Sequence, residues 1–157
     1  MSPLFALLNF GGLAILALLL WIFWIPAWQR RRAEAPLRTE LRTRPTVDFS
    51  IKVTAKAPLL GSDLPMRDFL NLTVRGDAFE ISHPKQSARV AFGREYCFRA
   101  ADTTVATAHS QMQDWIVVQG LPASRHNRVW ITNRGELAAI WDALVRAGAQ
   151  PASPPPR

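Results

Sequence analysis

The chain has 157 residues, with 19 Lys and Arg against 12 Asp and Glu and a formal net charge of +7. Its length suits one small domain with a further segment, and its single cysteine, Cys97, excludes an intramolecular disulfide and a thiolate metal site. The basic excess lies mainly in residues 30–45, whereas residues 46–150 carry only +2. Because a nucleic-acid-binding domain carries its basic charge on the domain itself, we expect no nucleic-acid partner.

The N-terminal segment is predicted to cross a membrane. No charged side chain precedes Arg30, and Leu4 to Trp24 is apolar apart from Asn9. About 21 residues in a helix rise about 31 Å, close to the thickness of the hydrocarbon core of a bilayer. We therefore expect a transmembrane helix within residues 1–29, and Pro26 is expected to end or kink it. A cleaved signal peptide is disfavoured because no basic residue precedes the apolar stretch.

The residues after the apolar stretch predict its orientation. Three tryptophans spaced i, i+3 and i+7 share one helix face, and indoles favour the headgroup level. Three arginines follow, and basic residues beside a membrane helix stay in the cytoplasm. We therefore expect the N-terminus outside and the C-terminal domain at the inner face of the plasma membrane. The expected interface anchors are Trp21, Trp24, Trp28, Arg30, Arg31 and Arg32.

Residues 30–46 are predicted to be a basic juxtamembrane linker. Its arginines either bind anionic headgroups or only determine the topology. Pro36 and Pro45 bracket a short predicted helix, Leu37 to Thr43, in which Leu37 and Leu41 share a face. We expect that face to rest on the bilayer.

Residues 47–150 are predicted to form a β-rich domain. Val47 to Val53 alternates apolar and polar side chains, as a half-buried strand does. A second alternation, Leu70 to Ile81, contains Gly76-Asp77 and predicts a hairpin. Further short strands are expected at Arg89–Phe92, Tyr96–Arg99, Thr103–Thr107, Trp115–Val118 and Arg128–Thr132.

The domain is expected to end in an amphipathic helix. Leu137, Ile140, Trp141, Leu144 and Val145 form one apolar stripe. A capping box from Asn133 and Glu136 is predicted to begin this helix, and Gly148 with Pro151 to end it. Trp115, Trp130 and Trp141 are expected in the core, and residues 151–157 form a Pro-rich tail expected to be disordered.

These elements predict an α+β fold: a transmembrane helix, then a small antiparallel sheet or partly open barrel closed by a C-terminal amphipathic helix. The hairpin 69–81, the stretch Tyr96 to Val105 and the closing run Ile140 to Gly148 resemble a bacterial pleckstrin-homology-like (PH-like) domain. With the membrane segment and the Ala- and Arg-rich composition, the chain is also similar to small membrane proteins of actinobacteria. The resemblance implies a fold and a binding role, and it supplies no functional residues.

No pattern of residues indicates catalysis. His83, His109 and His126 lack a paired ligand spacing, and the chain contains no nucleophile elbow, Walker loop or dinucleotide fingerprint. We therefore expect no enzyme activity, no cofactor and no metal. Cys97, between two aromatic residues, is expected to be buried and unreactive.

Basic residues in loops are the remaining candidates for a site. They are expected to hold an anion such as a headgroup phosphate, or to be simply solvated. The residues concerned are Lys85, Arg89, Arg125 and Arg128. The resulting hypothesis is a membrane-anchored, non-enzymatic binding module whose partners are anionic lipid headgroups or an unidentified membrane or cytoplasmic protein. The alternative is a structural accessory subunit of a larger membrane or envelope assembly, bound through its transmembrane helix.

Overall fold

The computed structural model describes residues 12–15, 17–18, 21, 25–56, 68–83, 95–123 and 127–156. The chain divides into two compact units, 1–33 and 34–157. Within the described ranges no helix has both the length and the apolar character needed to cross a membrane. Most of the predicted membrane segment, Leu4 to Trp24, lies outside these ranges.

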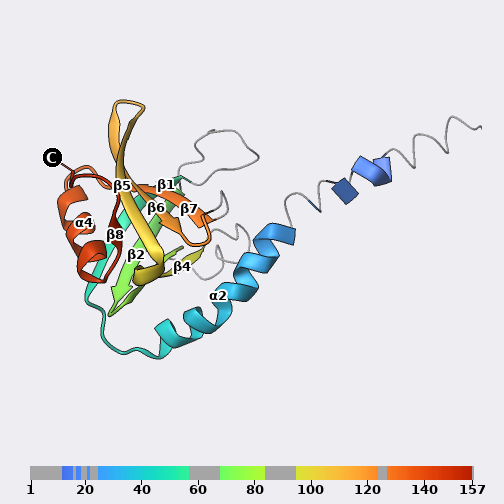
Figure 1. Ribbon diagram of the computed structural model, residues 1–157, viewed down its shortest axis with the longest axis horizontal. Helices are drawn as coiled ribbons and strands as arrows, with labels where there is room; N and C mark the ends of the chain where they lie inside the picture. The colour runs from blue at the N-terminus through green and yellow to red at the C-terminus, as the bar shows by residue number, and fades with distance from the viewer. Residues whose placement is uncertain are drawn as a thin grey trace, which may run out of the picture. The chain divides into compact units, whose positions relative to one another are not determined.

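Residues 34–157 form an α+β unit around one open, mostly antiparallel sheet (Figure 1). The order of the eight strands is β4-β3-β2-β1-β7-β6-β5-β8, and only β8 runs parallel to its neighbour. The coarse α+β prediction is therefore confirmed. The strands are β1 (Phe49–Lys56), β2 (Asp68–Arg75), β3 (Ala78–Ser82), β4 (Tyr96–Arg99), β5 (Thr103–Ser110), β6 (Gln113–Gly120), β7 (Arg128–Thr132) and β8 (Gln150–Pro151).

The β2–β3 hairpin confirms the strongest local prediction. Leu72 pairs with Ile81 and Val74 with Phe79 across the two strands. Gly76 occupies the turn with a φ of 62°, a conformation that glycine adopts at little cost. The predicted strands at Tyr96–Arg99 and Arg128–Thr132 are also found as β4 and β7. The predicted strand at Arg89–Phe92 lies outside the described residues.

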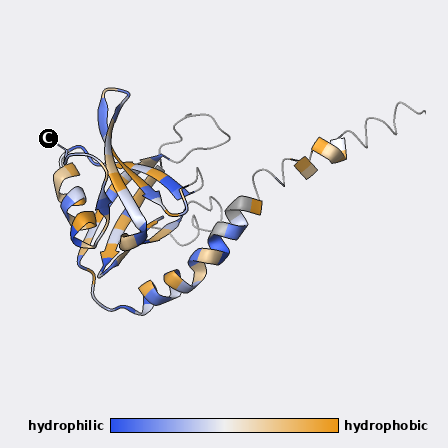
Figure 2. Ribbon diagram, viewed as in Figure 1, coloured by the Kyte–Doolittle hydropathy of each residue, from blue (hydrophilic) through white to orange (hydrophobic). Residues whose placement is uncertain are grey.

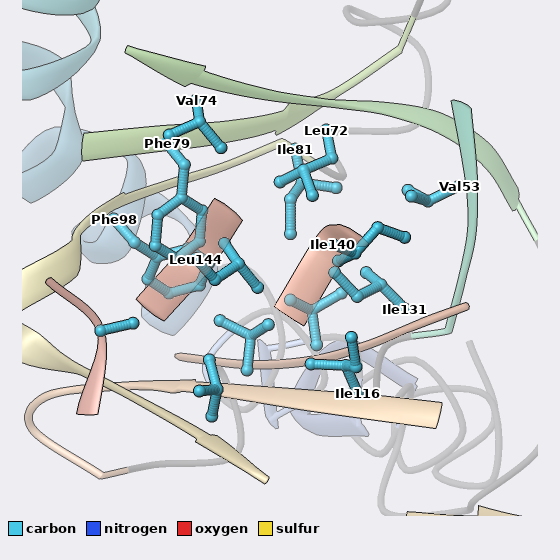
Figure 3. Close-up of a cluster of buried hydrophobic side chains, with 14 of the residues drawn as sticks. Val53, Leu72, Val74, Phe79, Ile81, Phe98, Ile116, Ile131, Ile140 and Leu144 are labelled. Atoms are coloured by element: carbon cyan, nitrogen blue, oxygen red, sulfur yellow. The ribbon is translucent and has the colours of Figure 1, made fainter. Parts of the chain in front are cut away.

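The core lies between the inner face of the sheet and helix α4 (Leu137–Arg146). Figure 3 shows Ile140 and Leu144 of this helix directed toward apolar side chains from the strands, among them Phe79 and Ile131. Apolar and polar residues recur along α4 in Figure 2, as its predicted stripe requires. Trp115 and Trp141 are buried, which confirms the prediction for them. Trp130 is half-buried and lies edge-on to Trp115, with 6.5 Å between the ring centroids.

The two ends of α4 differ in how well they were predicted. Gly148 has a φ of 110° just after the helix, so the predicted stop is confirmed. The predicted capping box is wrong, because Glu136 is the N-cap residue and makes no side-chain capping bond. The Asn133 side-chain amide instead donates a hydrogen bond of 2.9 Å to the backbone oxygen of Lys52. The side-chain oxygen of Asn133 accepts a hydrogen bond from the Gly135 N–H.

The C-terminal residues follow strand β5. Gln150 and Pro151 pair with Thr104 and Val105 as the short parallel strand β8. The Ser153 hydroxyl then accepts a hydrogen bond from the Thr107 N–H at 2.7 Å. The tail predicted to be disordered therefore has contacts along β5 in its first described residues, because this strand edge offers free backbone donors and acceptors.

Helix α2 (Ile25–Thr43) is longer than the predicted helix at Leu37–Thr43. Pro26 is the second described residue of α2, and residues 22–24, where the predicted membrane helix would end, lie outside the described residues. Pro36 does not begin a helix as predicted, since α2 runs through it. A Glu34–Arg38 salt bridge of 3.2 Å spans the turn that contains this proline.

The C-terminal part of α2 packs on the outer face of the sheet. Leu41 is 1% exposed and lies in a cluster with Ala78 of β3 and Cys97 of β4, against which Leu37 also packs. The prediction that the Leu37–Leu41 face rests on the bilayer is therefore wrong. Apolar side chains of the sheet cover Leu41 fully and Leu37 in part.

Ion pairs surround this packed face of α2. Arg38 lies 3.1 Å from the carboxylate of Glu95, whose side chain is only 9% exposed. Further along the helix, the Glu40 carboxylate lies 2.7 Å from Arg99 of β4. After the helix ends, the Arg44 guanidinium donates to the backbone oxygen of Arg75 and pairs with Asp77 in the β2–β3 turn. Residues 34–44 are thus part of the folded domain.

Candidate functional site

A groove of about 500 Å³ lies where strand β7 leaves the sheet. The β1–β7 ladder has three pairs, from Lys56 opposite Trp130 to Thr54 opposite Thr132. Beyond Thr132 the chain turns toward α4, so the ladder does not reach Lys52. The Asn133 side chain binds the Lys52 carbonyl at this point and satisfies a backbone group that the ladder leaves unpaired. The groove opens beside this contact.

Strands β1 and β2 provide one wall of the groove. Lys52 is opposite Asn71 and Thr54 is opposite Phe69 in the antiparallel register. Because alternate residues of a strand point to opposite faces, these four side chains lie on the face away from the core. Their neighbours Val53 and Leu70 are directed to the core and are each 2% exposed. The turn at Asn133 and Arg134 supplies the opposite wall.

The groove combines positive charge with an exposed aromatic ring. Lys52 and Arg134 line it, and no acidic side chain does so among the described residues. Neither of these two cations has an ion pair within the described part of the chain, in contrast to Arg38, Arg44 and Arg99. Phe69 is 75% exposed at the rim. The arrangement is suited to an anionic group next to an apolar one.

A second, smaller hollow of about 250 Å³ lies between β1 and the end of α4. Asp48 and Arg146 both line it, so its charges balance. The Asp48 carboxylate also accepts a hydrogen bond from the Gly76 N–H. This hollow is therefore a weaker candidate for a binding site than the groove at Lys52.

The loop residues proposed from sequence as an anion site are only partly described. Arg128 is the first residue of β7, and its Nε donates to the Gln119 side-chain oxygen at 2.7 Å. Lys85, Arg89 and Arg125 lie outside the described residues. The structure therefore leaves their proximity untested, and the one described member already has a partner within the fold.

The expected membrane-interface anchors lie in the first unit. Trp21 is 70% exposed and Trp28 is 50% exposed. Arg32 lies 5.4 Å from the centroid of the Trp28 ring, a cation–π distance, and Arg31 is exposed. Trp24 and the side chain of Arg30 lie outside the described residues. Exposed indoles next to guanidinium groups are what a membrane interface favours.

Among the described residues, Cys97 and His109 form no reactive arrangement. Burial raises the pKa of the Cys97 thiol to about 11, although the Arg38 guanidinium acts in the opposite direction. A neutral, buried thiol is a poor nucleophile, in agreement with the sequence prediction. His109 lies 2.7 Å from Asp114 on an exposed strand surface, and His126 is outside the described residues. In the described ranges no three His, Cys, Asp or Glu side chains form a group able to hold a metal.

Sequence reasoning missed the groove. Lys52 lies in a predicted strand and Phe69 next to one. The groove, however, lies where the β1–β7 ladder ends at Thr132, beside the Asn133–Lys52 hydrogen bond. The only available signal was the polar pair Asn133-Arg134 just after a predicted strand. Comparison of the chain with protein-family models, curated proteins and solved structures finds no match.

Proposed function

We propose that this protein is a membrane-anchored, non-enzymatic binding module at the inner face of the plasma membrane. It recognises a protein partner or an anionic lipid headgroup through its β domain. The groove at Lys52 is the observation that carries the proposal: two cations without intramolecular ion pairs among the described residues flank an exposed aromatic ring. Two cations beside an exposed aromatic ring offer a ligand both electrostatic and apolar contacts.

We propose further that the β domain is PH-like. The order β4-β3-β2-β1-β7-β6-β5, with every neighbouring pair antiparallel, and the helix α4 after the last of these strands support this assignment. Folds of this kind serve many binding functions, so the fold by itself favours a binding role without naming the ligand.

The composition of the N-terminal unit supports the membrane location. The apolar stretch from Leu4 to Trp24 precedes the arginines at 30–32, and the described indole of Trp28 is exposed beside Arg32. Basic residues next to a membrane helix favour the cytoplasmic side, which places the β domain there in this proposal.

Photo-crosslinking in native membranes tests the binding role. A photoreactive amino acid at Asn71, in the groove, is expected to give a discrete adduct with a protein or a lipid. The same group at Asp142, exposed on α4 and outside the groove, is the matched control. The absence of a groove-specific adduct would contradict the proposal.

Replacing the membrane segment distinguishes this function from the alternative of an accessory subunit. Residues 4–24 are replaced by a neutral apolar helix of the same length. The binding module is expected to keep its groove adduct at Asn71 after the exchange. Loss of the adduct together with loss of complex formation would instead favour a subunit that is held through its membrane helix.

A further inference from the structure

We infer that the groove at Lys52 binds a short acidic segment of another protein that carries an apolar side chain next to its carboxylates. This inference rests on the proposed binding function and names the class of partner. The charges of the groove, its exposed ring and its concavity together indicate this occupant.

Charge complementarity favours an anionic occupant. Lys52 and Arg134 line the groove from opposite walls, and no described acid lines it. Elsewhere in the described domain, Glu95 is paired with Arg38 and Asp77 with Arg44. A carboxylate in the groove would accept hydrogen bonds from the Arg134 guanidinium and the Lys52 ammonium.

The ring of Phe69 favours an apolar group beside the anion. It is 75% exposed on the same strand face as Thr54, its partner across the β1–β2 ladder. Covering an aromatic ring of this exposure is favourable in proportion to the area removed from water. A free phosphate or carboxylate alone would leave the ring in water.

A peptide suits the groove better than a lipid surface. The groove has a volume of about 500 Å³, which lies within the range of pockets that enclose a ligand. A bilayer surface is flat and makes contact with protruding groups, whereas this groove is recessed between strands β1 and β2 and the turn at Asn133 and Arg134. Peptide side chains can enter such a recess.

The occupant is another chain and not a second copy of this one. The protein has a net charge of +7, so two copies repel each other. Two of its described acids, Glu40 and Asp77, are already held by Arg99 and Arg44. A partner of opposite charge is also attracted at long range by the basic chain.

Peptide selection against the full chain tests this inference. The chain is placed in nanodiscs of zwitterionic phosphatidylcholine, and phage-displayed random peptides of 12 residues serve as the probe. The selected peptides are expected to carry Asp or Glu next to an aromatic or aliphatic residue. Binding of one synthesised peptide is then measured for the full chain and for the variants Lys52→Ala, Arg134→Ala and Phe69→Ala.

Each groove variant is expected to weaken peptide binding about tenfold or more, because each removes a central contact. The control Arg146→Ala removes an exposed cation outside the groove and should change binding less than about twofold. All four residues are at least partly exposed, so the folded state is preserved, and circular dichroism verifies it.

The other outcomes overturn the inference in distinguishable ways. Acidic peptides whose binding ignores the three groove variants would refute the groove and leave the proposed binding function standing. Binding to vesicles containing phosphatidylglycerol that depends on Lys52 and Arg134, with no peptide selected, would replace the protein partner by a lipid headgroup. Binding to neither probe would contradict both this inference and the proposed function.

Discussion

The docking of α2 on the sheet makes a quantitative prediction about stability. Leu41 is 1% exposed between Ala78 and Cys97, although it lies in a segment that the sequence predicts to be a linker. Truncating a fully buried leucine to alanine costs about 2–5 kcal/mol, depending on how far the site collapses. Here the loss has an upper limit, because α2 can detach from the sheet. Leu41→Ala therefore costs no more than removal of the whole docked segment.

Urea unfolding, monitored by tryptophan fluorescence, measures the stability lost in Leu41→Ala and the stability lost when the docked segment is removed. The unit 34–157 is compared with its Leu41→Ala variant and with a chain that begins at Thr46. At a slope of about 1.5 kcal/mol per M, a loss of about 3 kcal/mol lowers the urea midpoint by about 2 M. The chain from Thr46 is expected to lose at least as much as the variant.

Arg42→Ala is the matched control, because Arg42 is the next residue of the same helix and is exposed. Alanine is a better helix former than arginine, so the midpoint should stay within about 0.3 M. Equal midpoints for Leu41→Ala and Arg42→Ala would refute the docking argument. So would a chain from Thr46 that is as stable as the chain from residue 34.

Three further predictions concern the turn and the thiol. Iodoacetamide at pH 8 should leave Cys97 unmodified in the folded chain and label it fully in 8 M urea, because the thiol is 4% exposed and its pKa is about 11; rapid labelling of the folded protein would contradict this. Gly76→Ala should cost about 1–2 kcal/mol in urea unfolding, because residue 76 has a φ of 62° and an added Cβ would lie 2.9 Å from the Arg44 guanidinium; an unchanged midpoint would contradict it. The Arg44 hydrogen bond lowers the pKa of Asp77, so this contact stabilises the fold above about pH 4 and is lost as the pH falls further. The variant Asp77→Asn should therefore flatten the acid side of the curve of stability against pH. A curve parallel to that of the unchanged protein would count against the contact.

Local patterns predicted the elements whose own sequence determines them. The β2–β3 hairpin follows from alternation around Gly76, and α4 follows from one apolar stripe with Gly148 behind it. These signals need no knowledge of distant residues, since a strand face or a helix stripe is buried whatever covers it. The antiparallel sheet with a terminal helix could therefore be predicted.

Contacts between distant residues could not be predicted in the same way. The stripe of Leu37 and Leu41 indicates a buried helix face but does not say whether lipid or protein covers it. Asn133 matches a capping pattern, yet its amide binds Lys52, 81 positions earlier in the chain. That contact lies beside the groove, so the candidate site is built from residues brought together by a tertiary contact that has no local signature.

The pairing of the two residues of β8 could not be predicted from the local sequence either. Gln150 and Pro151 are too few to form an alternating pattern, and Pro-rich segments are normally extended and solvated. Their pairing with β5 is reinforced by the Ser153 hydroxyl at the Thr107 N–H. A single side chain therefore helps to attach the tail, and composition does not reveal it.

The central claim is that a membrane anchor holds the binding domain at the inner face of the membrane. Paired reporters fused after Arg157, one active only inside the cell and one active only outside, test this claim most directly. The account predicts activity from the inside reporter alone, with the fusion remaining in the membrane fraction after carbonate extraction. Activity from the outside reporter would contradict the account and require a partner beyond the membrane.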